Sequence, residues 1–326
     1  EPVRTNMIYT SGTTGLPKGV QREPATEAMV SRMGEMVSLV FDIGSNADMR
    51  TVVTGPVYHS APNFYALYAA QSGGLVILQP RFEAEELLAL VERHRITHLH
   101  MVPTMFVRLL KLPDAVKQRY DLSSLKFAVH AAAPCPSEVK RRMIEWWGPV
   151  INEYYGGTET GAVVFVTSEE ALKKPGTVGK PLSFATVRIY DEAGAVLPAG
   201  EIGEVYVWNE GFPDFVYRGL DEKRRQVGRD GLVTCGDIGY LDEDGYLFLC
   251  DRAWDMVISG GVNIYPAEIE AVLIDMPGVQ DCAVFGIPDE EFGESLCAYV
   301  QPEVGHEPTV DEVRGWLEPR LAKYKL

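Results

Sequence analysis

The sequence predicts an α/β fold in three sections: a large first part, a β-rich section over residues 176–251, and a small α+β unit hinged to the rest. Three observations support this prediction. Strand-length apolar runs alternate with amphipathic helical segments up to about Gly176. Strands separated by turns come next, and a short α+β pattern ends the chain. Strands alternating with helices are typical of sheets that bind ligands at their strand ends.

The first part supplies the alternation. Residues 51–62 begin as a buried strand and end in a Pro/His/Ser loop, and residues 73–80 read as another strand. Residues 83–95 carry apolar side chains at helical spacing, which predicts a helix. The same pattern repeats downstream, with strands predicted over residues 97–103 and 125–134 and helices over residues 104–112 and 137–147. Ser137 is the expected N-cap of the last helix.

Turn signals organise the second and third sections. The sequences DEAG (191–194) and DEDG (242–245) favour hairpins. In the last section, residues 266–279 form a helical pattern with a proline near its start. Two strands are then predicted over residues 281–289 and 295–303. A final helix over residues 309–324 opens with a capping box made by Thr309 and Glu312.

Composition excludes several classes of function. The chain has 326 residues, 46% of them hydrophobic, and a formal net charge of -16, so nucleic acid and anionic membranes are not expected partners. Five scattered cysteines without C-x-x-C spacing predict neither disulfides nor a zinc site, and they favour the cytoplasm. No apolar run approaches the roughly 20 residues of a membrane span, so no transmembrane segment is predicted.

A first candidate site is the loop YTSGTTGLPKGV over residues 9–20. Lys18 has the spacing of a Walker lysine, but Pro17 and Gly19 replace the second glycine and the hydroxyl of that motif. Backbone N–H groups and hydroxyls in such a loop can surround polyphosphate oxygens while the lysine offsets their charge. The alternative is a polar turn with a solvated lysine.

Two later segments carry complementary chemistry. NEYYGGTETGA (152–162) places the Glu159 carboxylate beside the Thr158 hydroxyl and a pair of tyrosines, which suits magnesium, phosphate and a flat ring. The alternative is a tyrosine corner with a surface glutamate. In CGDIGYLDEDGYLFLCDR (235–252), Asp237 can accept both hydroxyls of a ribose, or it can be a plain hairpin aspartate.

These motifs occur in a fixed order, ending in ISGGVNIYPAEIE. In that order the sequence resembles the adenylate-forming superfamily of acyl-CoA synthetases, luciferases and peptide-synthetase adenylation domains, and the run GGVNIYPAEIE is most similar to acyl-CoA ligases. The resemblance implies that a carboxylic acid reacts with Mg-ATP to give an acyl-adenylate. Coenzyme A then displaces AMP after the small C-terminal domain has rotated. ATP, Mg²⁺ and coenzyme A are therefore the expected cofactors and co-substrates.

The resemblance also assigns roles to residues. The expected catalytic set is Lys18, His59, Thr158 and Glu159, in which Thr158 contacts the α-phosphate, Glu159 binds magnesium, and His59 gates the passage between acid and pantetheine. The expected β- and γ-phosphate ligands are Thr10, Ser11, Gly12, Thr13, Thr14, Gly15 and Lys18. The remaining nucleotide and coenzyme A contacts are Tyr155 on adenine, Ala133 and Gly156 beside it, Asp237 and Arg252 on ribose, and Gly260 and Gly261 along the pantetheine tunnel. His130 is expected in the pocket wall without an acid–base role.

The sequence departs from the family pattern in three ways. The family has a large portion before the phosphate loop and a catalytic lysine beyond the equivalent of Leu326, so the sequence is expected to be a fragment. Lys323 and Lys325 match residues preceding that missing segment. The expected division places the AMP- and acyl-binding domain in residues 1–251 and the rotating domain in residues 252–326. Trp254 stands at the hinge, where an indole either biases the rotation or has little effect.

Side-chain volume suggests the acid. The pocket is expected near residues 59–64, 130–134 and 156–162, where Gly157, Gly161 and three alanines leave space. A medium- or long-chain acid, or a bulky aromatic or alicyclic one, is therefore favoured over acetate. The alternatives are an adenylation enzyme that loads a carrier protein and a catalytically impaired nucleotide-binding homologue. A homodimer is left open.

Overall fold

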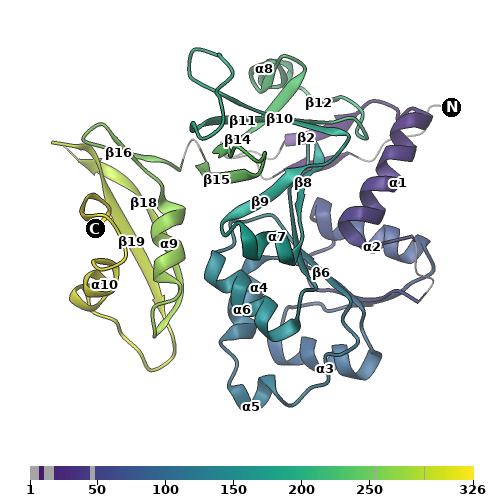
Figure 1. Cartoon of the computed structure of the whole chain (residues 1–326), viewed down its shortest axis with the longest axis horizontal. Helices are drawn as coiled ribbons and strands as arrows, with labels where there is room; N and C mark the ends of the chain where they lie inside the picture. The colour runs from purple at the N-terminus through teal and green to yellow at the C-terminus, as the bar shows by residue number, and fades with distance from the viewer. Residues whose placement is uncertain (1–6, 11–17, 45–47, 253–254, 290) are drawn as a thin grey trace.

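The computed structural model describes residues 7–10, 18–44, 48–252, 255–289 and 291–326. Figure 1 shows a large body, with a smaller lobe formed by the C-terminal residues at its side. Ser11, Gly12, Thr13, Thr14, Gly15 and the hinge residue Trp254 lie outside the described residues, so the predictions made for them are not tested. Within the described part, no helix is long and apolar enough to cross a membrane.

A parallel sheet forms the centre of the body. The parallel pairs are β3–β4, β3–β5, β5–β6 and β6–β7. The bounds of these strands are β3 (Arg50–Val53), β4 (Leu75–Leu78), β5 (His98–Met101), β6 (Phe127–His130) and β7 (Ile151–Gly157). The helices of this part are α1 (Glu27–Phe41), α2 (Ser60–Gln71), α3 (Ala84–His94), α4 (Pro103–Leu110), α5 (Asp114–Lys117) and α6 (Ser137–Trp147).

The two faces of this sheet have separate apolar cores. Neighbouring residues of a strand point to opposite faces, and on β6 Ala128 packs with α3, α4 and α6 while Val129 packs with α1 and α2. Both residues are fully buried. Helices thus cover both faces, which is the arrangement that the alternating pattern predicts. The α/β fold class is confirmed.

Local boundaries differ from prediction at two helix starts. The α4 helix begins at Pro103, because proline suits the first helical turn, where its missing N–H costs nothing. The prediction of Ser137 as N-cap is wrong. Pro136 occupies that position and Ser137 is the first helical residue, so its hydroxyl makes no cap hydrogen bond.

The sheet continues through the β-rich section as antiparallel strands. The full order is β10-β11-β14-β15-β9-β8-β7-β6-β5-β3-β4, with β13 beside β14, and it makes a 12-stranded sheet among the described residues. The added elements are β8 (Gly161–Val166), α7 (Ser168–Lys173), β9 (Thr177–Pro181), β10 (Ala185–Tyr190), β11 (Gly203–Asn209), α8 (Asp221–Gln226), β13 (Gly228–Arg229), β14 (Leu232–Leu241) and β15 (Leu247–Arg252). The DEDG turn joins β14 to β15 as predicted, and Tyr190 bridges Val196 across the DEAG turn.

A second, smaller sheet carries Lys18, the lysine of the phosphate loop. Its order is β1-β2-β12, built from β1 (Ile8–Thr10), β2 (Lys18–Arg22) and β12 (Phe215–Tyr217). Lys18 pairs with Thr10 in register, so both ends of the loop are fixed at one edge. Val20 packs on Phe215 and Tyr217 beneath it.

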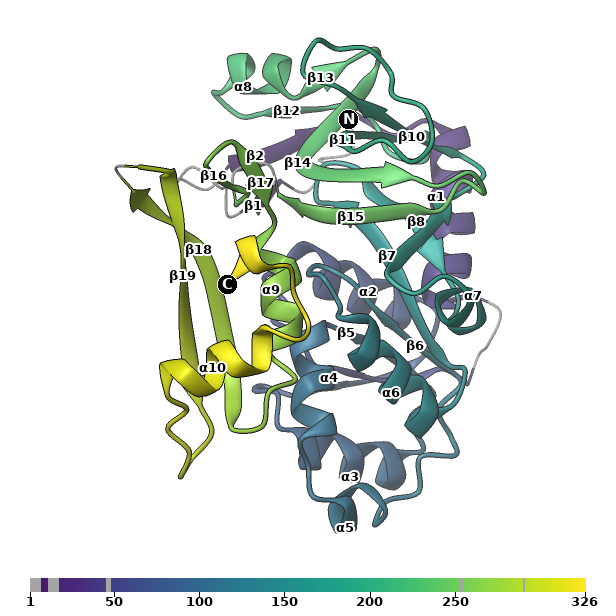
Figure 2. The ribbon, with the colours of Figure 1, turned by 60° about the vertical axis from the view of Figure 1, so that its left-hand side comes forward.

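The C-terminal lobe has its own sheet and core. The sheet order is β17-β16-β19-β18, and Figure 2 shows α9 and α10 beside it. The elements are β16 (Val257–Ser259), β17 (Val262–Ile264), α9 (Pro266–Leu273), β18 (Val279–Asp289), β19 (Gly293–Pro302), α10 (Val310–Leu317) and a 3₁₀ turn (Lys323–Lys325). Thr309 and Glu312 form the predicted capping box. The domain boundary at residue 252 stays a prediction.

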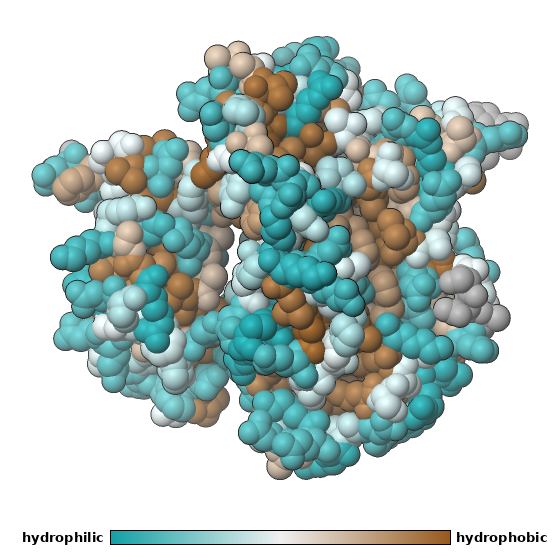
Figure 3. Space-filling view, viewed as in Figure 1, coloured by the Kyte–Doolittle hydropathy of each residue, from teal (hydrophilic) through white to brown (hydrophobic). Residues whose placement is uncertain are grey.

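The lobe meets the body across a furrow that is visible in the space-filling view of Figure 3. Lys111, just after α4, crosses to the lobe, where its Nζ donates to the Gln280 carbonyl oxygen at 3.2 Å and lies 3.4 Å from the Glu303 carboxylate. The cavity described next extends to this furrow, because it is lined both by residues of α4 in the body and by residues of α9 in the lobe.

Candidate active site

A cavity of about 2210 Å³ lies where the two sheets and the lobe meet. Ligand sites of single small molecules are typically about 300–1,000 Å³, so this one has room for a nucleotide and a second substrate. Ten predicted site residues line it: Thr10, Lys18, His59, Ala133, Tyr155, Gly156, Thr158, Glu159, Asp237 and Arg252. Residues up to 242 positions apart in the sequence therefore face one space.

Tyr155 and Asp237 are joined directly on one wall. The Tyr155 hydroxyl, on β7, donates to Asp237 Oδ2 at 2.6 Å. Asp237 and Arg252 are register partners on β14 and β15, with 3.7 Å between Arg252 Nε and Asp237 Oδ1. Burial raises the pKa of the Asp237 carboxyl, although the Tyr155 hydrogen bond and the Arg252 charge both act to lower it. An aromatic ring and a carboxylate that can accept hydrogen bonds from ribose hydroxyls thus lie side by side.

The turn between β7 and β8 presents Thr158 and Glu159 to the cavity. Ser60 Oγ, at the start of α2, lies 3.1 Å from Thr158 Oγ1. The Tyr217 hydroxyl donates to Glu159 Oε1 at 2.8 Å, and Lys18 Nζ lies 5.2 Å from the centroid of the Tyr217 ring. A carboxylate, a hydroxyl and an ammonium group therefore share one side of the cavity. Glu159 offers the hard oxygen ligand that magnesium prefers.

The glycines of this turn have a different role from the one predicted. A Cβ on Gly161 would lie 2.3 Å from the Phe212 ring, and one on Gly157 would lie 2.8 Å from Cys235 Sγ. Phe212 and Cys235 fill the space next to these two glycines, so the prediction that the glycines leave room in the pocket is wrong. Gly156 approaches the Gly161 carbonyl oxygen so closely that a Cβ would lie 1.9 Å from it. These glycines permit close packing of the turn.

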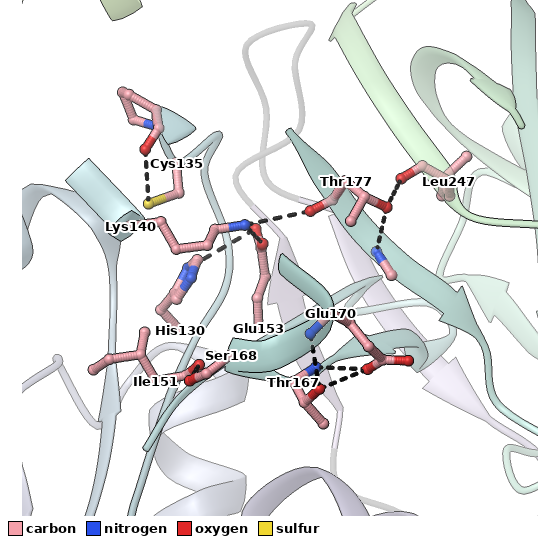
Figure 4. Close-up of polar contacts among 12 residues, drawn as sticks. His130, Cys135, Lys140, Ile151, Glu153, Thr167, Ser168, Glu170, Thr177 and Leu247 are labelled. Carbon is pink, nitrogen blue, oxygen red and sulfur yellow. Dashed lines mark hydrogen bonds and ion pairs between the residues drawn. The ribbon is translucent and has the colours of Figure 1, made fainter. Parts of the chain in front are cut away.

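A buried ion pair between Lys140 and Glu153 borders the cavity (Figure 4). Lys140, on α6, contacts the Glu153 carboxylate on β7 and donates to the Thr177 carbonyl oxygen of β9 at 3.3 Å. Both charged side chains are almost fully buried, with 6% and 5% exposed. The pair therefore ties helix α6 to strands β7 and β9 of the sheet next to the cavity.

His130 is buried behind the wall, contrary to the prediction that it lines the pocket. Its side chain has no exposed surface, and neither ring nitrogen has a hydrogen-bond partner among the described residues. Its Nδ1 lies 3.9 Å from Glu153 Oε1, which would be an ion pair only with a protonated ring. Burial and the Lys140 charge hold the His130 pKa well below its ordinary value, so the ring is neutral.

Three other predicted residues lie at the edge of the site or outside it. His59 is exposed at the N-cap of α2 and lines the mouth of the cavity, so its role as gate stays a prediction. Gly260 and Gly261 form the turn between β16 and β17 with positive φ angles. They do not line the cavity, and their contact with pantetheine also stays a prediction.

Several site residues were missed from the sequence. Tyr217, Arg22, Lys140 and Glu153 all line the cavity, as does Ser60, which lies in the predicted pocket segment 59–64 but was assigned no role of its own. Ser60 directly follows His59, and Arg22 comes four residues after Lys18, so proximity to a motif was a usable signal for both. Tyr217 has no such signal, because its partner Glu159 is 58 residues away.

Comparison with known proteins gives consistent matches. The model of the AMP-binding enzyme family matches residues 5–214, and that of the AMP-binding enzyme C-terminal domain matches residues 268–326.

Among curated proteins, feruloyl-CoA synthase of Amycolatopsis sp is 36% identical over 98% of this chain and 64% of its own length. Long-chain-fatty-acid–CoA ligase of Bacillus subtilis (strain 168) is 33% identical over 98% of this chain and 56% of its own. The structure of o-succinylbenzoate CoA synthetase from Bacillus subtilis, in complex with its acyl-adenylate intermediate, superimposes with a TM-score of 0.85 at 31% identity, over 100% of this chain and 64% of that one. The chain thus spans 56–64% of the length of these relatives.

Proposed function

The chain belongs to the family of AMP-binding enzymes, and from that premise we propose that it activates a carboxylic acid with ATP and transfers the acyl group to coenzyme A. In the first step a carboxylate oxygen attacks the α-phosphorus, and the bond to the β-phosphate breaks to release pyrophosphate. In the second step the thiol attacks the carbonyl carbon of the acyl-adenylate, and AMP leaves. The relative whose structure holds an acyl-adenylate intermediate supports the first step. The relatives named as a CoA synthase and a CoA ligase support the second.

One observation carries the proposal. The cavity brings Tyr155 and Asp237, the Thr158–Glu159 turn and Lys18 to one space from three separate sheet segments. We infer that Tyr155 and Asp237 hold the nucleoside, while Lys18 and Thr158 contact phosphate oxygens. Glu159 would hold Mg²⁺, which neutralises phosphate charge when it is bound. Fixed donors and charges of this kind stabilise charge that develops in the transition state.

The apolar residues in the lining of the same cavity support a bulky acid. This apolar wall comes from α1, α2, β7, β8 and the loop before β12, and its residues are Met33, Met36, Phe41, Phe64, Tyr154, Ala162 and Phe212. Methionine and aromatic side chains suit an extended or ring-shaped apolar ligand. We therefore propose a medium- or long-chain, aromatic or alicyclic acid. The apolar wall supports this choice of acid, whereas the glycines of the turn do not, because they leave no such space.

The test is a panel of acids assayed with the full-length polypeptide. Acetate, octanoate, palmitate, cinnamate and cyclohexanecarboxylate would each be incubated with ATP and Mg²⁺, with and without coenzyme A. We expect an acyl-CoA product by mass spectrometry for the larger acids. Acid-dependent pyrophosphate release with no acyl-CoA product, and with no stimulation of AMP release by coenzyme A, would favour an enzyme that loads a carrier protein. Acetate as the best substrate would contradict the proposed acid.

Nucleotide affinity should depend on pH through Asp237. An ionised carboxylate accepts ribose hydroxyls, and burial raises the pKa of this group above the ordinary 3.8. AMP affinity is therefore expected to fall as the pH is lowered through the raised pKa, at a higher pH than an ordinary aspartate would give. Asp237→Asn should bind AMP about tenfold more weakly at neutral pH and lose this dependence, because a hydrogen bond to a charged group is worth about 1.5–3 kcal/mol. Isothermal titration calorimetry at a series of pH values, from that of an ordinary aspartate pKa up to neutrality, measures both quantities.

Tyr155→Phe gives the matched control. Its hydroxyl donates to Asp237 and lowers the pKa of the carboxyl, so its loss should move the midpoint to higher pH. A pH profile that is the same in the wild type, Asp237→Asn and Tyr155→Phe would contradict the role of Asp237.

A further inference from the structure

Arg22 connects three segments that meet at the active site. It ends β2, four residues after Lys18, and it lines the cavity. Its Nη1 donates to the Pro213 carbonyl oxygen at 3.2 Å, and its Nη2 donates to the Thr158 carbonyl oxygen. Its guanidinium carbon lies 4.7 Å from the centroid of the Phe212 ring. One side chain thus joins the strand after the phosphate loop, the Thr158–Glu159 turn and the loop that enters β12.

The rest of the turn explains why this contact matters. Inside the turn, the Gly157 N–H donates to Thr160 Oγ1 at 3.2 Å, and the Thr160 N–H donates to the Gly157 carbonyl oxygen at 3.3 Å. These bonds close the turn on itself. The Arg22 bond to the Thr158 carbonyl is different, because it fixes the peptide between Thr158 and Glu159 to a strand that is 136 residues away in the sequence.

The charge of Arg22 is retained in this setting. Burial lowers the pKa of Arg22 to about 10, while the nearby Glu159 and Asp214 carboxylates act to raise it. The guanidinium is therefore cationic at neutral pH. Its bonds to carbonyl oxygens are charge-assisted, and such bonds are shorter and stronger than neutral ones.

We propose that Arg22 is a positioning residue, which orients the Thr158–Glu159 turn relative to Lys18. In this orientation the Thr158 hydroxyl, the Glu159 carboxylate and the Lys18 ammonium group can contact the same Mg-nucleotide. The proposal rests on the proposed function for the identity of that ligand. It needs no contact between Arg22 and the substrates. A flat guanidinium can bond two carbonyls at once, whereas a lysine ammonium is a point donor at the end of a flexible stem.

Arg224 offers a matched control in the same region. It is also partly buried, its Nε donates to the Phe215 carbonyl oxygen at 3.0 Å, and its guanidinium carbon lies 4.6 Å from the centroid of the Phe215 ring. It does not line the cavity. Arg224→Lys therefore alters a carbonyl bond and a ring contact like those of Arg22, together with an ion pair to Asp214 at 2.7 Å, but outside the cavity.

The first measurement is hydrogen exchange of the amides of residues 156–161, which needs no catalytic activity. Arg22→Lys is expected to speed exchange in this segment about tenfold relative to the wild type, and Arg224→Lys is expected to leave it unchanged. Arg22→Gln, which keeps one donor but no charge, should show the same increase. Exchange in either Arg22 variant that equals that of Arg224→Lys would overturn the proposal.

The second measurement separates this inference from the proposed function. In Arg22→Lys, acyl-adenylate formation should fall about 10- to 100-fold, because small misplacements of reacting groups have effects of this size. Half-saturation by Mg²⁺ should move to higher concentration, while AMP affinity stays within about threefold. If the wild type forms no adenylate and Arg22→Lys still loosens the turn, the proposed function fails and the positioning role stands. If adenylation and Mg²⁺ dependence match those of Arg224→Lys, the positioning role is wrong.

Discussion

Replacing Glu159 with glutamine is expected to lower the rate of acyl-adenylate formation by about 10²–10³-fold, an effect typical of removing one preorganised electrostatic group. Glutamine has nearly the same shape as glutamate. Its side-chain oxygen can still accept the hydrogen bond that the Tyr217 hydroxyl donates to Glu159 Oε1 at 2.8 Å. What it loses is the negative charge that Mg²⁺ requires. The rate is measured as acid-dependent pyrophosphate release at saturating ATP and Mg²⁺.

Tyr217→Phe is the control for this prediction. It removes the hydrogen bond to Glu159 and keeps the carboxylate, so it should lower the rate by less than about tenfold. AMP affinity should be similar in both variants, because the nucleoside is held by other residues. A Glu159→Gln enzyme with a rate near that of the wild type would show that the carboxylate is not the magnesium ligand.

Replacing Lys140 with methionine should be the most destabilising single change in the wall of the cavity. It leaves Glu153 buried without its partner, and breaking a buried ion pair in this way costs about 3–5 kcal/mol. The two side chains are only 6% and 5% exposed, so water cannot replace the lost contact. Urea unfolding of the wild type and of Lys140→Met measures this loss as the difference between their free energies of unfolding.

The double variant Lys140→Met/Glu153→Met tests the physical reason. Replacing both charges by apolar side chains removes the uncompensated carboxylate, so most of the stability should return. A double variant that is less stable than Lys140→Met alone would contradict this account. It would mean that the link from Lys140 to the Thr177 carbonyl of β9, a bond of 3.3 Å, matters more than the charge balance.

Local signals account for the parts of the fold that the sequence predicted correctly. The helix predicted over residues 83–95 is α3 (Ala84–His94), because its apolar spacing is local and its leucines meet one face of the sheet. The hairpin at DEDG likewise needs only its own turn residues. The motifs around Tyr155, Glu159 and Asp237 predicted one site, and the cavity places them together.

Long-range contacts account for what the sequence could not predict. Gly161 reads as empty space, but Phe212, 51 positions later, fills it. Arg22 lies close to Lys18 in the sequence, but its proposed positioning role depends on carbonyl oxygens that are 136 and 191 residues away. The α1 helix, which supplies Met33 and Met36 to the cavity, was not predicted at all, although Thr26 caps it by accepting from the Met29 N–H.

Acid-dependent isotope exchange between pyrophosphate and ATP tests the central claim most directly. Exchange requires reversible formation of an acyl-adenylate and needs no coenzyme A. We predict exchange in the full-length polypeptide with at least one of the larger acids, and its loss in Glu159→Gln. If AMP binds through Asp237 but no acid in the panel supports exchange, the cavity is a nucleotide site without ligase activity, and the account is contradicted.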